Sequence, residues 1–330
     1  MTLSTRPFGR TGHITTAIGF GAWAIGGTWG EVTETEAKAT LHAALDAGMT
    51  FIDTADVYGD GRSERIIRAV LAERPGPRPF VATKAGRRLN PHTATAYTPA
   101  AIESFIDRSL QNLGVDCLDL LQLHCPPSPV YSNATLFDGL EAIKAKGKIA
   151  NYGVSVETIA EAMVAIEQPG VVSVQMIYNL FRQRPSEAFF AAARARNVAV
   201  IARVPLASGL LSGKMSANSQ FAADDHRSFN RNGEAFDKGE TFSGVPYDVA
   251  LEAVDALRPL VPQGASMAAF ALRWIMMEQA VTVVIPGAKS PAQALANAQA
   301  DALAPLSNDV MQAARDIYAS LIAKHVQHLW

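Results

Sequence analysis

Short apolar segments rich in β-branched residues recur along the chain and alternate with segments of helical periodicity. Eight of them predict strands, over residues 17–23, 49–55, 80–85, 118–124, 149–155, 171–177, 198–205 and 281–287. Each segment is almost continuously apolar rather than alternating between apolar and polar residues. Parallel strands that are covered on both faces have this pattern, so the segments predict a parallel sheet.

Helical patterns lie between the predicted strands. Residues 98–113 are an example, because Pro99 stands in the first turn and Gly114 follows the last turn, an asymmetry that helices favour. The other predicted helices cover residues 33–47, 63–73, 133–146, 157–167, 185–196, 266–278 and 291–299. Eight strands that alternate with helices predict an α/β fold, a (β/α)8 TIM barrel that forms a single domain over residues 1–330.

A doubly wound sheet is the alternative fold. It usually has fewer strands and carries a GxGxxG turn after the first of them. Gly19, Gly21, Gly26 and Gly27 follow one another in the first predicted strand and the turn after it, but they do not have that spacing. The glycine pattern therefore favours the barrel.

Three segments lie outside the repeat. Residues 5–16 contain Gly9 and Gly12 between polar residues and predict a hairpin that covers the barrel floor. Residues 206–246 form a long loop rich in Gly, Ser and Asp after the seventh strand, and loops of that length are usually functional or disordered. Residues 308–324 predict an additional helix near the C-terminus.

Composition and charge narrow the function. The chain is 48% hydrophobic and 18% charged with a formal net charge of −2, so no positive field favours nucleic acid or an anionic membrane as a partner. The two cysteines, Cys117 and Cys125, form neither a disulfide framework nor a metal-ligand spacing. The first residues have no apolar signal-peptide region, and no apolar run is long enough for a membrane span. We expect a cytoplasmic protein without a metal.

Candidate chemistry gathers at the carboxyl ends of the strands, where barrels carry their active sites. Asp53, Lys84 and His124 lie at the ends of the second, third and fourth predicted strands, and Tyr58 follows the second. Each also has a purely structural interpretation: a turn-capping acid, a solvated lysine, a core histidine or a packing aromatic. Only their convergence on one rim points to a site.

These four residue types together suit proton transfer. Free tyrosine has a pKa of about 10, and a lysine ammonium near the phenol lowers that pKa. An aspartate paired with the lysine holds it in position, and a histidine can hydrogen-bond the substrate oxygen. We therefore expect Tyr58 to exchange a proton with a substrate oxygen while Lys84, Asp53 and His124 tune it.

The chain also resembles the aldo-keto reductases over nearly its whole length. The matching stretches are "GFGAWAIGG" (19–27), "FIDTADVYG" (51–59), "VATKAG" (81–86), "DLLQLH" (119–124), "YGVS" (152–155), "VQMIYN" (174–179), "PLASGLLSGK" (205–214) and "VIPGAKSPAQALANA" (284–298). The resemblance implies a (β/α)8 barrel that binds a nicotinamide cofactor without a Rossmann domain. It also implies that Asp53, Tyr58, Lys84 and His124 are the catalytic tetrad, with Tyr58 as the general acid–base.

The same resemblance implies a set of cofactor-binding residues. They are Gly21, Ala22, Trp23 and Asp53 near the nicotinamide, Ser155, Val156 and Gln175 near its carboxamide, Arg203, Pro205, Leu206, Ser208, Gly209, Leu211 and Lys214 near the pyrophosphate, and Gly287, Lys289, Gln293 and Asn297 near the adenine and ribose. The chain departs from the family pattern at two positions. Val156 stands where Asn is frequent, and Arg203 stands where an aromatic commonly stacks on the nicotinamide, so Arg203 is expected to stack there or to contact the pyrophosphate.

The resemblance indicates the cofactor preference and the substrate class less specifically than it indicates the fold. Lys289 is a point charge for a 2′-phosphate, while Gln293 stands where arginine is frequent, so NADP(H) is moderately favoured over NAD(H). Trp23, Trp29 and Tyr131 could form aromatic walls around a small-molecule carbonyl compound, alcohol or sugar. The reaction direction and the oligomeric state are not indicated by the sequence.

Two other functions remain open. A barrel lyase would use Lys84 as a Schiff-base nucleophile, and borohydride would then trap substrate on Lys84. A cofactor-binding regulatory subunit of a larger assembly would resemble the aldo-keto reductase-like β subunits of channels. Tight cofactor retention with negligible turnover would indicate that function, against which the complete tetrad argues.

Overall fold

The computed structural model describes residues 2–27, 30 and 32–330. Its main sheet has eight parallel strands in the order β10-β9-β8-β7-β6-β5-β4-β3. They are β3 (Phe20–Gly21), β4 (Phe51–Asp53), β5 (Phe80–Ala85), β6 (Leu120–His124), β7 (Tyr152–Ser155), β8 (Val171–Ile177), β9 (Ala199–Arg203) and β10 (Val281–Val284). Parallel bridges from Ile18 to Val284 and from Gly21 to Gly287 join the first strand to the last. The predicted (β/α)8 barrel is confirmed, and all eight strands lie within the predicted segments.

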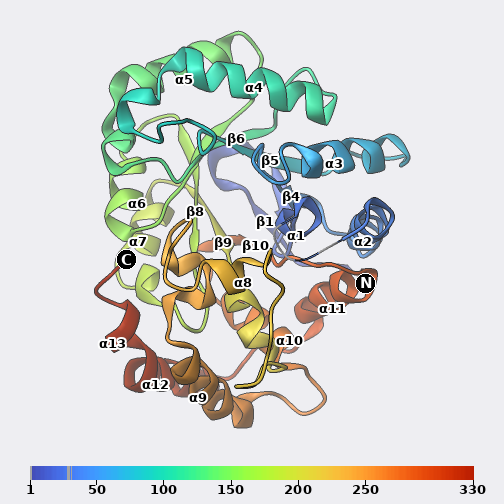
Figure 1. Ribbon diagram of the computed structural model, residues 1–330, viewed down its shortest axis with the longest axis vertical. Coiled ribbons are helices and arrows are strands. Elements are labelled where there is room, and N and C mark those ends of the chain that lie inside the picture. Colours follow the sequence, from blue (N-terminus) through green and yellow to red (C-terminus); the bar gives the residue numbers. More distant parts are fainter. Residues whose placement is uncertain (1, 28–29, 31) are drawn as a thin grey trace.

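Helices surround the strands (Figure 1). Those that follow the repeat are α2 (Glu34–Asp46), α3 (Arg62–Ala72), α4 (Pro99–Leu113), α5 (Ala134–Ala145), α6 (Ile159–Ala165), α7 (Phe189–Ala195), α10 (Met267–Met276) and α11 (Pro291–Gln299). Local chemistry sets their ends: Thr33 and Glu36 form a complete capping box on α2, and Gly114 ends α4 with a φ of 66°. The helix predicted over residues 185–196 is interrupted, because Ala188 leaves helical geometry before α7.

The N-terminal hairpin is also confirmed. Strand β1 (Thr5–Pro7) pairs antiparallel with β2 (Ile14–Thr16), and a short helix, η1 (Gly9–Thr11), joins them. Between them Phe8 is fully buried and stacks on Phe51, with ring centroids 5.4 Å apart. One buried cluster inside the barrel consists of Phe8, Phe51, Phe80, Ala82, Leu120, Val172, Ala199, Ile201, Val283 and Ile285. The hairpin therefore closes the barrel floor with an apolar plug.

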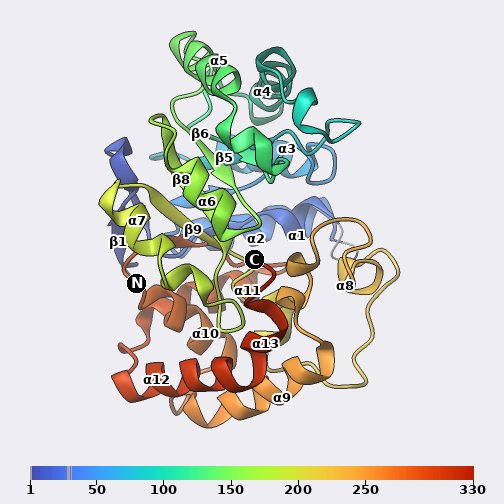
Figure 2. The ribbon, with the colours of Figure 1, turned by 90° about the vertical axis from the view of Figure 1, so that its left-hand side faces the viewer.

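Residues 206–246 lie at the opposite end of the barrel from the hairpin (Figure 2). They contain η5 (Ala207–Ser212), α8 (His226–Phe229), η6 (Lys238–Glu240) and η7 (Phe242–Gly244). Hydrogen bonds hold this segment together, since Ser208 Oγ donates to the carbonyl of Glu240 at 3.0 Å and accepts from the amide of Phe242 at 3.0 Å. The predicted long loop is thus an ordered cover over the mouth of the barrel.

The remaining elements are short or lie near the C-terminus. They are η2 (Ala94–Ala96), η3 (Ser128–Ser132), η4 (Arg184–Ser186), α9 (Tyr247–Leu257), η8 (Arg258–Leu260), η9 (Ala300–Ala302), α12 (Asn308–Ile317), η10 (Tyr318–Ile322) and α13 (Ala323–Val326). The last three make up the predicted C-terminal helix, with a π-helical stretch in η10. Helix α9 is absent from the sequence-based predictions, although its buried Ala250, Ala253, Val254 and Leu257 follow helical spacing.

One strand end differs from its prediction. The first barrel strand stops at Gly21, and Trp23 begins a short helix, α1 (Trp23–Gly26). The chain is crowded at Gly21, where a Cβ atom would lie 2.7 Å from the carbonyl oxygen of Ile285. Arg62 then donates to the carbonyl of Ile25 at 2.7 Å, which holds α1 against α3. Among the described residues, no helix combines the length and apolar character needed to cross a membrane.

Candidate active site

An ion pair between Lys84 and Asp53 lies at the centre of the barrel mouth. The Nζ atom of Lys84 is 2.5 Å from Oδ1 of Asp53, and the two side chains are only 1% and 4% exposed. Lys84 also donates to the carbonyl of Thr54 at 2.9 Å. The other carboxylate oxygen of Asp53 accepts from the amides of Gln175 at 2.7 Å and Gln122 at 3.0 Å. Several donors therefore fix a charged carboxylate, which in turn fixes the lysine.

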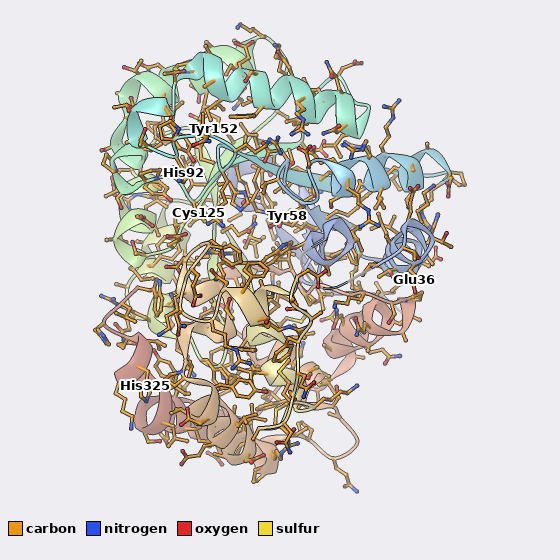
Figure 3. The ribbon with its side chains drawn as sticks, viewed as in Figure 1. Glu36, Tyr58, His92, Cys125, Tyr152 and His325 are labelled. Carbon is orange, nitrogen blue, oxygen red and sulfur yellow. The ribbon has the colours of Figure 1, made fainter. Side chains whose placement is uncertain are left out.

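Tyr58, labelled in Figure 3, is partly buried and lies next to this pair. Lys84 Nζ is 3.3 Å from the phenol oxygen. Two glycines allow the approach: a Cβ atom at Gly26 would lie 2.7 Å from Cβ of Tyr58, and Gly59 has a φ of +60°. A Cβ atom at Gly59 would also lie 1.9 Å from the carbonyl oxygen of Gly26. The close packing of this turn against α1 therefore requires a glycine at position 59, directly after Tyr58.

His124, the last residue of β6, faces the edge of the Tyr58 ring. The two ring centroids are 6.0 Å apart and the rings are inclined by 87°. Burial lowers the pKa of His124 well below its usual value, and the positive charges of Arg87 and Lys84 lower it further. Its buried Nδ1 atom has no hydrogen-bond partner among the described residues. A neutral imidazole in this place can hydrogen-bond an uncharged substrate oxygen.

The pKa of Tyr58 differs from the sequence-based expectation. Burial raises the pKa of its phenol above the usual value, and the opposing attraction of Lys84 offsets only part of that rise. Lys84 lowers the pKa of Tyr58 as expected, but burial, together with Asp53, which also disfavours a phenolate, outweighs that effect, so the net change is upward. Burial alone would lower the pKa of Lys84, but Asp53 and Tyr58 together raise it, so the lysine is charged.

Aromatic side chains line one side of Tyr58. Trp23 stacks on it with ring centroids 6.0 Å apart and an interplanar angle of 15°. Two residues of the 206–246 segment extend this wall, with His226 at 4.9 Å and Phe236 at 6.0 Å from the Trp23 ring. Neither was among the sequence candidates, because the long loop has no periodicity that would place its residues.

Two other aromatic residues, Tyr131 and Trp29, were also predicted to line the substrate site. Tyr131 is fully buried and donates its hydroxyl to the carbonyl of Ser155 at 3.0 Å, so it supports the strand end and does not face substrate. That prediction is wrong because the η3 turn packs Tyr131 into the core. Trp29 lies outside the described residues.

Arg203 is engaged in a buried ion pair. Its Nη2 atom is 2.8 Å from Oε1 of Glu240, and both side chains are 9% exposed. Its Nη1 atom donates to the carbonyl of Val156 at 2.8 Å. The carboxylate of Glu240 raises the pKa of Arg203 despite burial, so the guanidinium is permanently charged. The structure places Arg203 as a bridge between β9, β7 and the 206–246 segment, a role that the prediction of a stacking or pyrophosphate-binding side chain did not include.

The ends of β7 and β8 bring together Ser155, Val156 and Gln175, the residues predicted to lie near the nicotinamide carboxamide. Ser155 and Gln175 pair in register. The amide nitrogen of Gln175 is bound to Asp53, and Ser155 Oγ accepts from the thiol of Cys125 at 3.4 Å. Gln122, one strand away, joins the same hydrogen-bond group and was missed, although it lies two residues before His124 on the same face of β6.

The predicted pyrophosphate segment has an unusual backbone. Val204, Ala207, Ser208 and Gly209 all have positive φ angles, of 53°, 46°, 55° and 96°. Such turns form concave backbone surfaces that bind anions. Pro205 and Leu206 lead into η5, while Leu211 is fully buried in the core and Lys214 is exposed. Leu211 can therefore contribute its backbone but not its side chain.

The predicted adenine and ribose segment follows β10. Gly287 pairs with Gly21 and accepts from the side chain of Asn297 at 3.2 Å. Gln293 uses its side-chain oxygen to accept from the amide of Lys289 at 2.8 Å. Asn297 and Gln293 thus shape the turn that carries Lys289. The side chain of Gln293 is bound to the backbone of Lys289 itself.

A second cation lies near Lys289. Burial lowers the pKa of Lys289, and the positive charge of Arg227 lowers it further. Arg227 is held by Asp225, with Nη2 2.6 Å from Oδ2, and contacts the carbonyl of Ser208 at 3.4 Å. The residue types fit the phosphates of a dinucleotide: two cations beside a concave backbone. Arg227 was missed because nothing in the sequence indicates where α8 lies.

The described residues contain no group of three or more His, Cys, Asp or Glu side chains placed to hold a metal ion. The candidate site consists of the side chains described above. It combines a (β/α)8 barrel with a buried Asp–Lys–Tyr group and a histidine at the carboxyl ends of β4, β5 and β6. These features define the class of barrel oxidoreductases to which the sequence comparisons point.

The family model described as Aldo/keto reductase family matches residues 17–319. The chain belongs to this family, and the resemblance inferred from its sequence is confirmed. Its members are oxidoreductases that bind nicotinamide cofactors and act on small carbonyl or sugar compounds.

Individual relatives cover most of the chain. The aldo-keto reductase YhdN of Bacillus subtilis (strain 168) is 32% identical over 289 residues, which are 86% of this chain and 84% of YhdN. The aldo-keto reductase yakc of Schizosaccharomyces pombe, named for NADP(+), is 29% identical over 302 residues, 88% of this chain and 84% of yakc. The structure of the glycerol dehydrogenase AKR11B4 from Gluconobacter oxydans matches with a TM-score of 0.78 and 30% identity over 99% of this chain and 97% of its own.

Proposed function

We propose that this protein is an NAD(P)(H)-dependent oxidoreductase that interconverts a small aldehyde, ketone or sugar with its alcohol, with Tyr58 as the proton donor. The observation that carries the proposal is the position of Lys84 Nζ, 2.5 Å from Asp53 and 3.3 Å from the Tyr58 phenol. An ammonium there stabilises the phenolate that remains when the phenol gives up its proton.

The side chains divide the work at the substrate oxygen. A bound nicotinamide supplies or accepts the hydride at the substrate carbon. His124, kept neutral by burial, hydrogen-bonds the carbonyl oxygen and orients it toward Tyr58. Because burial raises the pKa of Tyr58, the phenol carries its proton at neutral pH and can donate it as negative charge develops on that oxygen. In the reverse direction, the phenolate beside Lys84 removes the proton from the alcohol.

The cofactor assignment rests on the charges beside the 206–246 segment. Trp23 stacks on Tyr58 and would lie alongside the nicotinamide. The left-handed backbone at Ala207 and Ser208, together with Arg227 and Lys289, would hold the phosphates. Two cations close together favour the additional phosphate of NADP(H) over NAD(H), and the name of the yakc relative specifies NADP(+).

The lyase alternative is disfavoured by the same geometry. A Schiff-base lysine must lose its proton to become a nucleophile. Asp53 and Tyr58 instead raise the pKa of Lys84, and the ammonium donates to Asp53, Thr54 and Tyr58. Lys84 is thus held as a charged donor rather than as a free amine.

The proposal is tested by following nicotinamide absorbance with a panel of aldehydes, ketones and sugars, using NADPH, NADH and their oxidised forms. Tyr58→Phe is expected to lower kcat by roughly 10²–10⁴-fold, the usual contribution of a general acid–base. Cofactor binding, measured by fluorescence titration, should be unchanged. Turnover in the variant equal to that of the wild type would show that Tyr58 is not the proton donor. If the wild type shows no turnover with any combination of substrate and cofactor, the oxidoreductase function is rejected.

A further inference from the structure

A second arginine, Arg87, lies at the mouth of the site. It follows Lys84 by three residues, after Gly86, whose φ is +111°. A Cβ atom at Gly86 would lie 2.5 Å from the ring of Tyr97, so this turn requires glycine. Arg87 Nη2 reaches across to β7 and pairs with Oε1 of Glu157 at 3.1 Å, and the two side chains are 22% and 29% exposed. Unlike the buried pair of Lys84 and Asp53, the pair of Arg87 and Glu157 is accessible to small molecules.

Arg87 lies near the groups that would receive the substrate. Its guanidinium carbon is 6.0 Å from the centroid of the Phe236 ring, which is 6.0 Å from the ring of Trp23. Trp23 in turn stacks on Tyr58. After burial, Arg87 is also the foremost cause of the lowered pKa of His124, ahead of Lys84. Arg87 therefore lies beside Phe236 and close enough to His124 for its charge to act on that imidazole.

The two arginines of the mouth differ in their counter-ions. Glu240, the partner of Arg203, has a lowered pKa because Arg203 and Arg87 together outweigh its burial. Glu157, the partner of Arg87, has a pKa raised to about 7 by burial and by Asp237. The direct partner of Arg203 is thus a carboxyl group with a lowered pKa, whereas the direct partner of Arg87 is a carboxyl group with a pKa of about 7.

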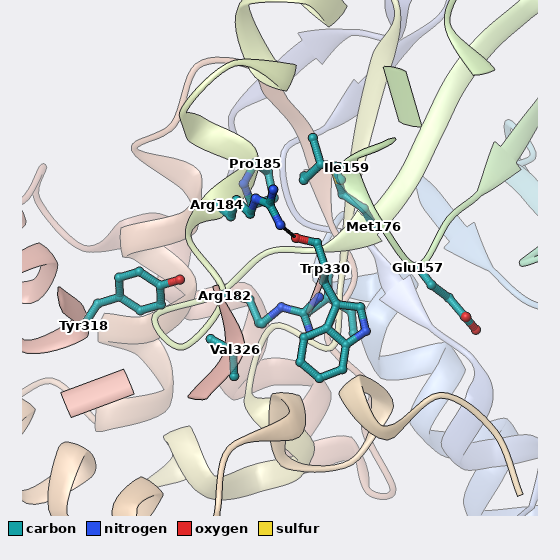
Figure 4. Close-up of a pocket in the computed structure, with 10 residues that line it drawn as sticks. Glu157, Ile159, Met176, Arg182, Arg184, Pro185, Tyr318, Val326 and Trp330 are labelled. Atoms are coloured by element: carbon teal, nitrogen blue, oxygen red, sulfur yellow. Dashed lines mark hydrogen bonds between the residues drawn. The ribbon is translucent and has the colours of Figure 1, made fainter. Parts of the chain in front are cut away.

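Asp237 is one of the groups that raise the pKa of Glu157. Glu157 lines a small cavity with Arg182 and Trp330 (Figure 4). The indole nitrogen of Trp330 donates to Asp237 at 3.0 Å, and the indole ring lies 3.9 Å from the Arg182 guanidinium. Asp237 is therefore held in place as a negative charge beside Glu157. A stronger anion arriving from solvent would be a better partner for Arg87 than Glu157 is.

From these contacts we infer that Arg87 binds a carboxylate on the substrate, and that the enzyme acts on aldehydes or ketones that carry an acid group and on the corresponding hydroxy acids. The inference rests on the proposed function. The carbonyl oxygen lies at Tyr58 and His124, the apolar linker lies against Trp23 and Phe236, and the carboxylate pairs with the guanidinium. The planar fork of Arg87 matches a carboxylate through two parallel hydrogen bonds.

The test compares acidic and neutral substrates of the same shape. The pairs are 4-carboxybenzaldehyde with 4-methylbenzaldehyde, and 4-oxobutanoate with butanal. The wild type is expected to show a kcat/KM at least about tenfold higher for the acid of each pair, the effect of one charge-assisted contact. Arg87→Met should abolish the preference, because KM rises more for the acids than for the neutral aldehydes.

Two further variants separate binding from folding. Arg87→Lys keeps the charge without the fork and should show an intermediate preference. Arg88→Met removes a charge from the next residue, which pairs with Asp60, and should leave the preference unchanged. An equal loss for acidic and neutral substrates in Arg87→Met, or a wild type without any preference, would overturn the inference.

Binding measured without turnover distinguishes this inference from the proposed function. Calorimetric titration of the holoenzyme with 4-(hydroxymethyl)benzoate and with 4-methylbenzyl alcohol needs no reaction. Tighter binding of the acid that is lost in Arg87→Met supports the anion site even if no aldehyde is reduced. Equal binding of the two alcohols would reject the anion site even if both aldehydes are reduced.

Discussion

Arg203 at the end of β9 and Glu240 in η6 form a buried ion pair across 37 residues of chain, with 2.9 Å between Nε and Oε1. Arg203 also donates to the carbonyls of Val156 and Gln175. The pair therefore ties the 206–246 segment, which covers the candidate active site, to the ends of β7, β8 and β9. Its cost is the desolvation of two charges, so either charge alone would be poorly accommodated.

This relationship predicts a large penalty for breaking the pair. Glu240→Gln or Arg203→Met should each lower the free energy of unfolding by about 3–5 kcal/mol, because each leaves a buried charge without its partner. The double variant should lose less than the sum of the two. Denaturant unfolding measures the coupling, and limited proteolysis within residues 213–237 reports loosening of the cover. Additive losses would show that the two side chains act independently.

The interplay of burial and charge at Tyr58 predicts a pH effect. Lys84 opposes the rise in the pKa of Tyr58 that burial causes, so Lys84→Met should raise that pKa further. In the proposed mechanism alcohol oxidation needs the phenolate, so the rate rises with pH through the pKa of Tyr58, and this rise should move to higher pH in the variant, together with a lower kcat. The pH profile of kcat/KM for oxidation checks this. A profile that keeps its midpoint would place the observed limb on another group.

Lys289 predicts a difference between the two nicotinamide cofactors. If it faces the 2′-phosphate, Lys289→Met should raise KM for NADPH by roughly tenfold, equivalent to about 1.4 kcal/mol, and leave KM for NADH nearly unchanged. Lys214→Met is a suitable control, because the pyrophosphate that Lys214 is predicted to contact is common to both cofactors, so any change in KM should be equal for NADPH and NADH. Steady-state kinetics with both cofactors give the answer, and an equal rise for both would remove Lys289 from phosphate recognition.

Asp56 predicts a dependence of stability on pH. This carboxyl group is fully buried, its oxygens have no hydrogen-bond partner within the described part of the chain, and burial and Glu64 raise its pKa from 3.8 to about 7. Between these pH values the folded protein binds a proton that the unfolded chain has lost. Stability from this group is therefore present below the lower value and is lost as pH rises toward 7.

Asp56→Asn removes that titration. The variant should gain stability over the wild type progressively between pH 4 and pH 7, by about 1.4 kcal/mol for each unit of pKa difference. Thermal unfolding across this range measures the gain. Asp60→Asn is the control, because Asp60 is exposed and pairs with Arg88 and Arg108. Parallel stability curves for wild type and Asp56→Asn would show that Asp56 titrates normally.

The ion pair of Glu157 with Arg87 is expected to weaken the binding of a substrate anion to Arg87. Glu157→Gln removes the competing carboxylate without removing its volume, so KM for carboxylate-bearing substrates should fall at pH 8. At pH 6 the effect should be smaller, because Glu157 is largely protonated below its pKa of about 7. Kinetics with 4-carboxybenzaldehyde at the two pH values test this, and a pH-independent change would point to packing instead of charge.

The sequence by itself determined the barrel. Its strands are apolar on both faces and its helices carry their own caps, such as Thr33 with Glu36, so short-range patterns sufficed to place them. The strand ends were also readable, which brought Asp53, Lys84, His124 and the turn at Tyr58 to one rim. These side chains meet because parallel strands in one barrel end on the same side.

Only the tertiary structure decided which polar groups meet. Gln175 binds Asp53 across 122 residues, Arg203 finds Glu240 inside a segment without periodicity, and Tyr131 turns into the core instead of toward the site. The same holds for Arg227 beside Lys289 and for Phe236 beside Trp23. Hydrophobic period and capping are local properties of a chain, whereas ion pairing, desolvation and pKa depend on neighbours that are brought together only when the chain folds.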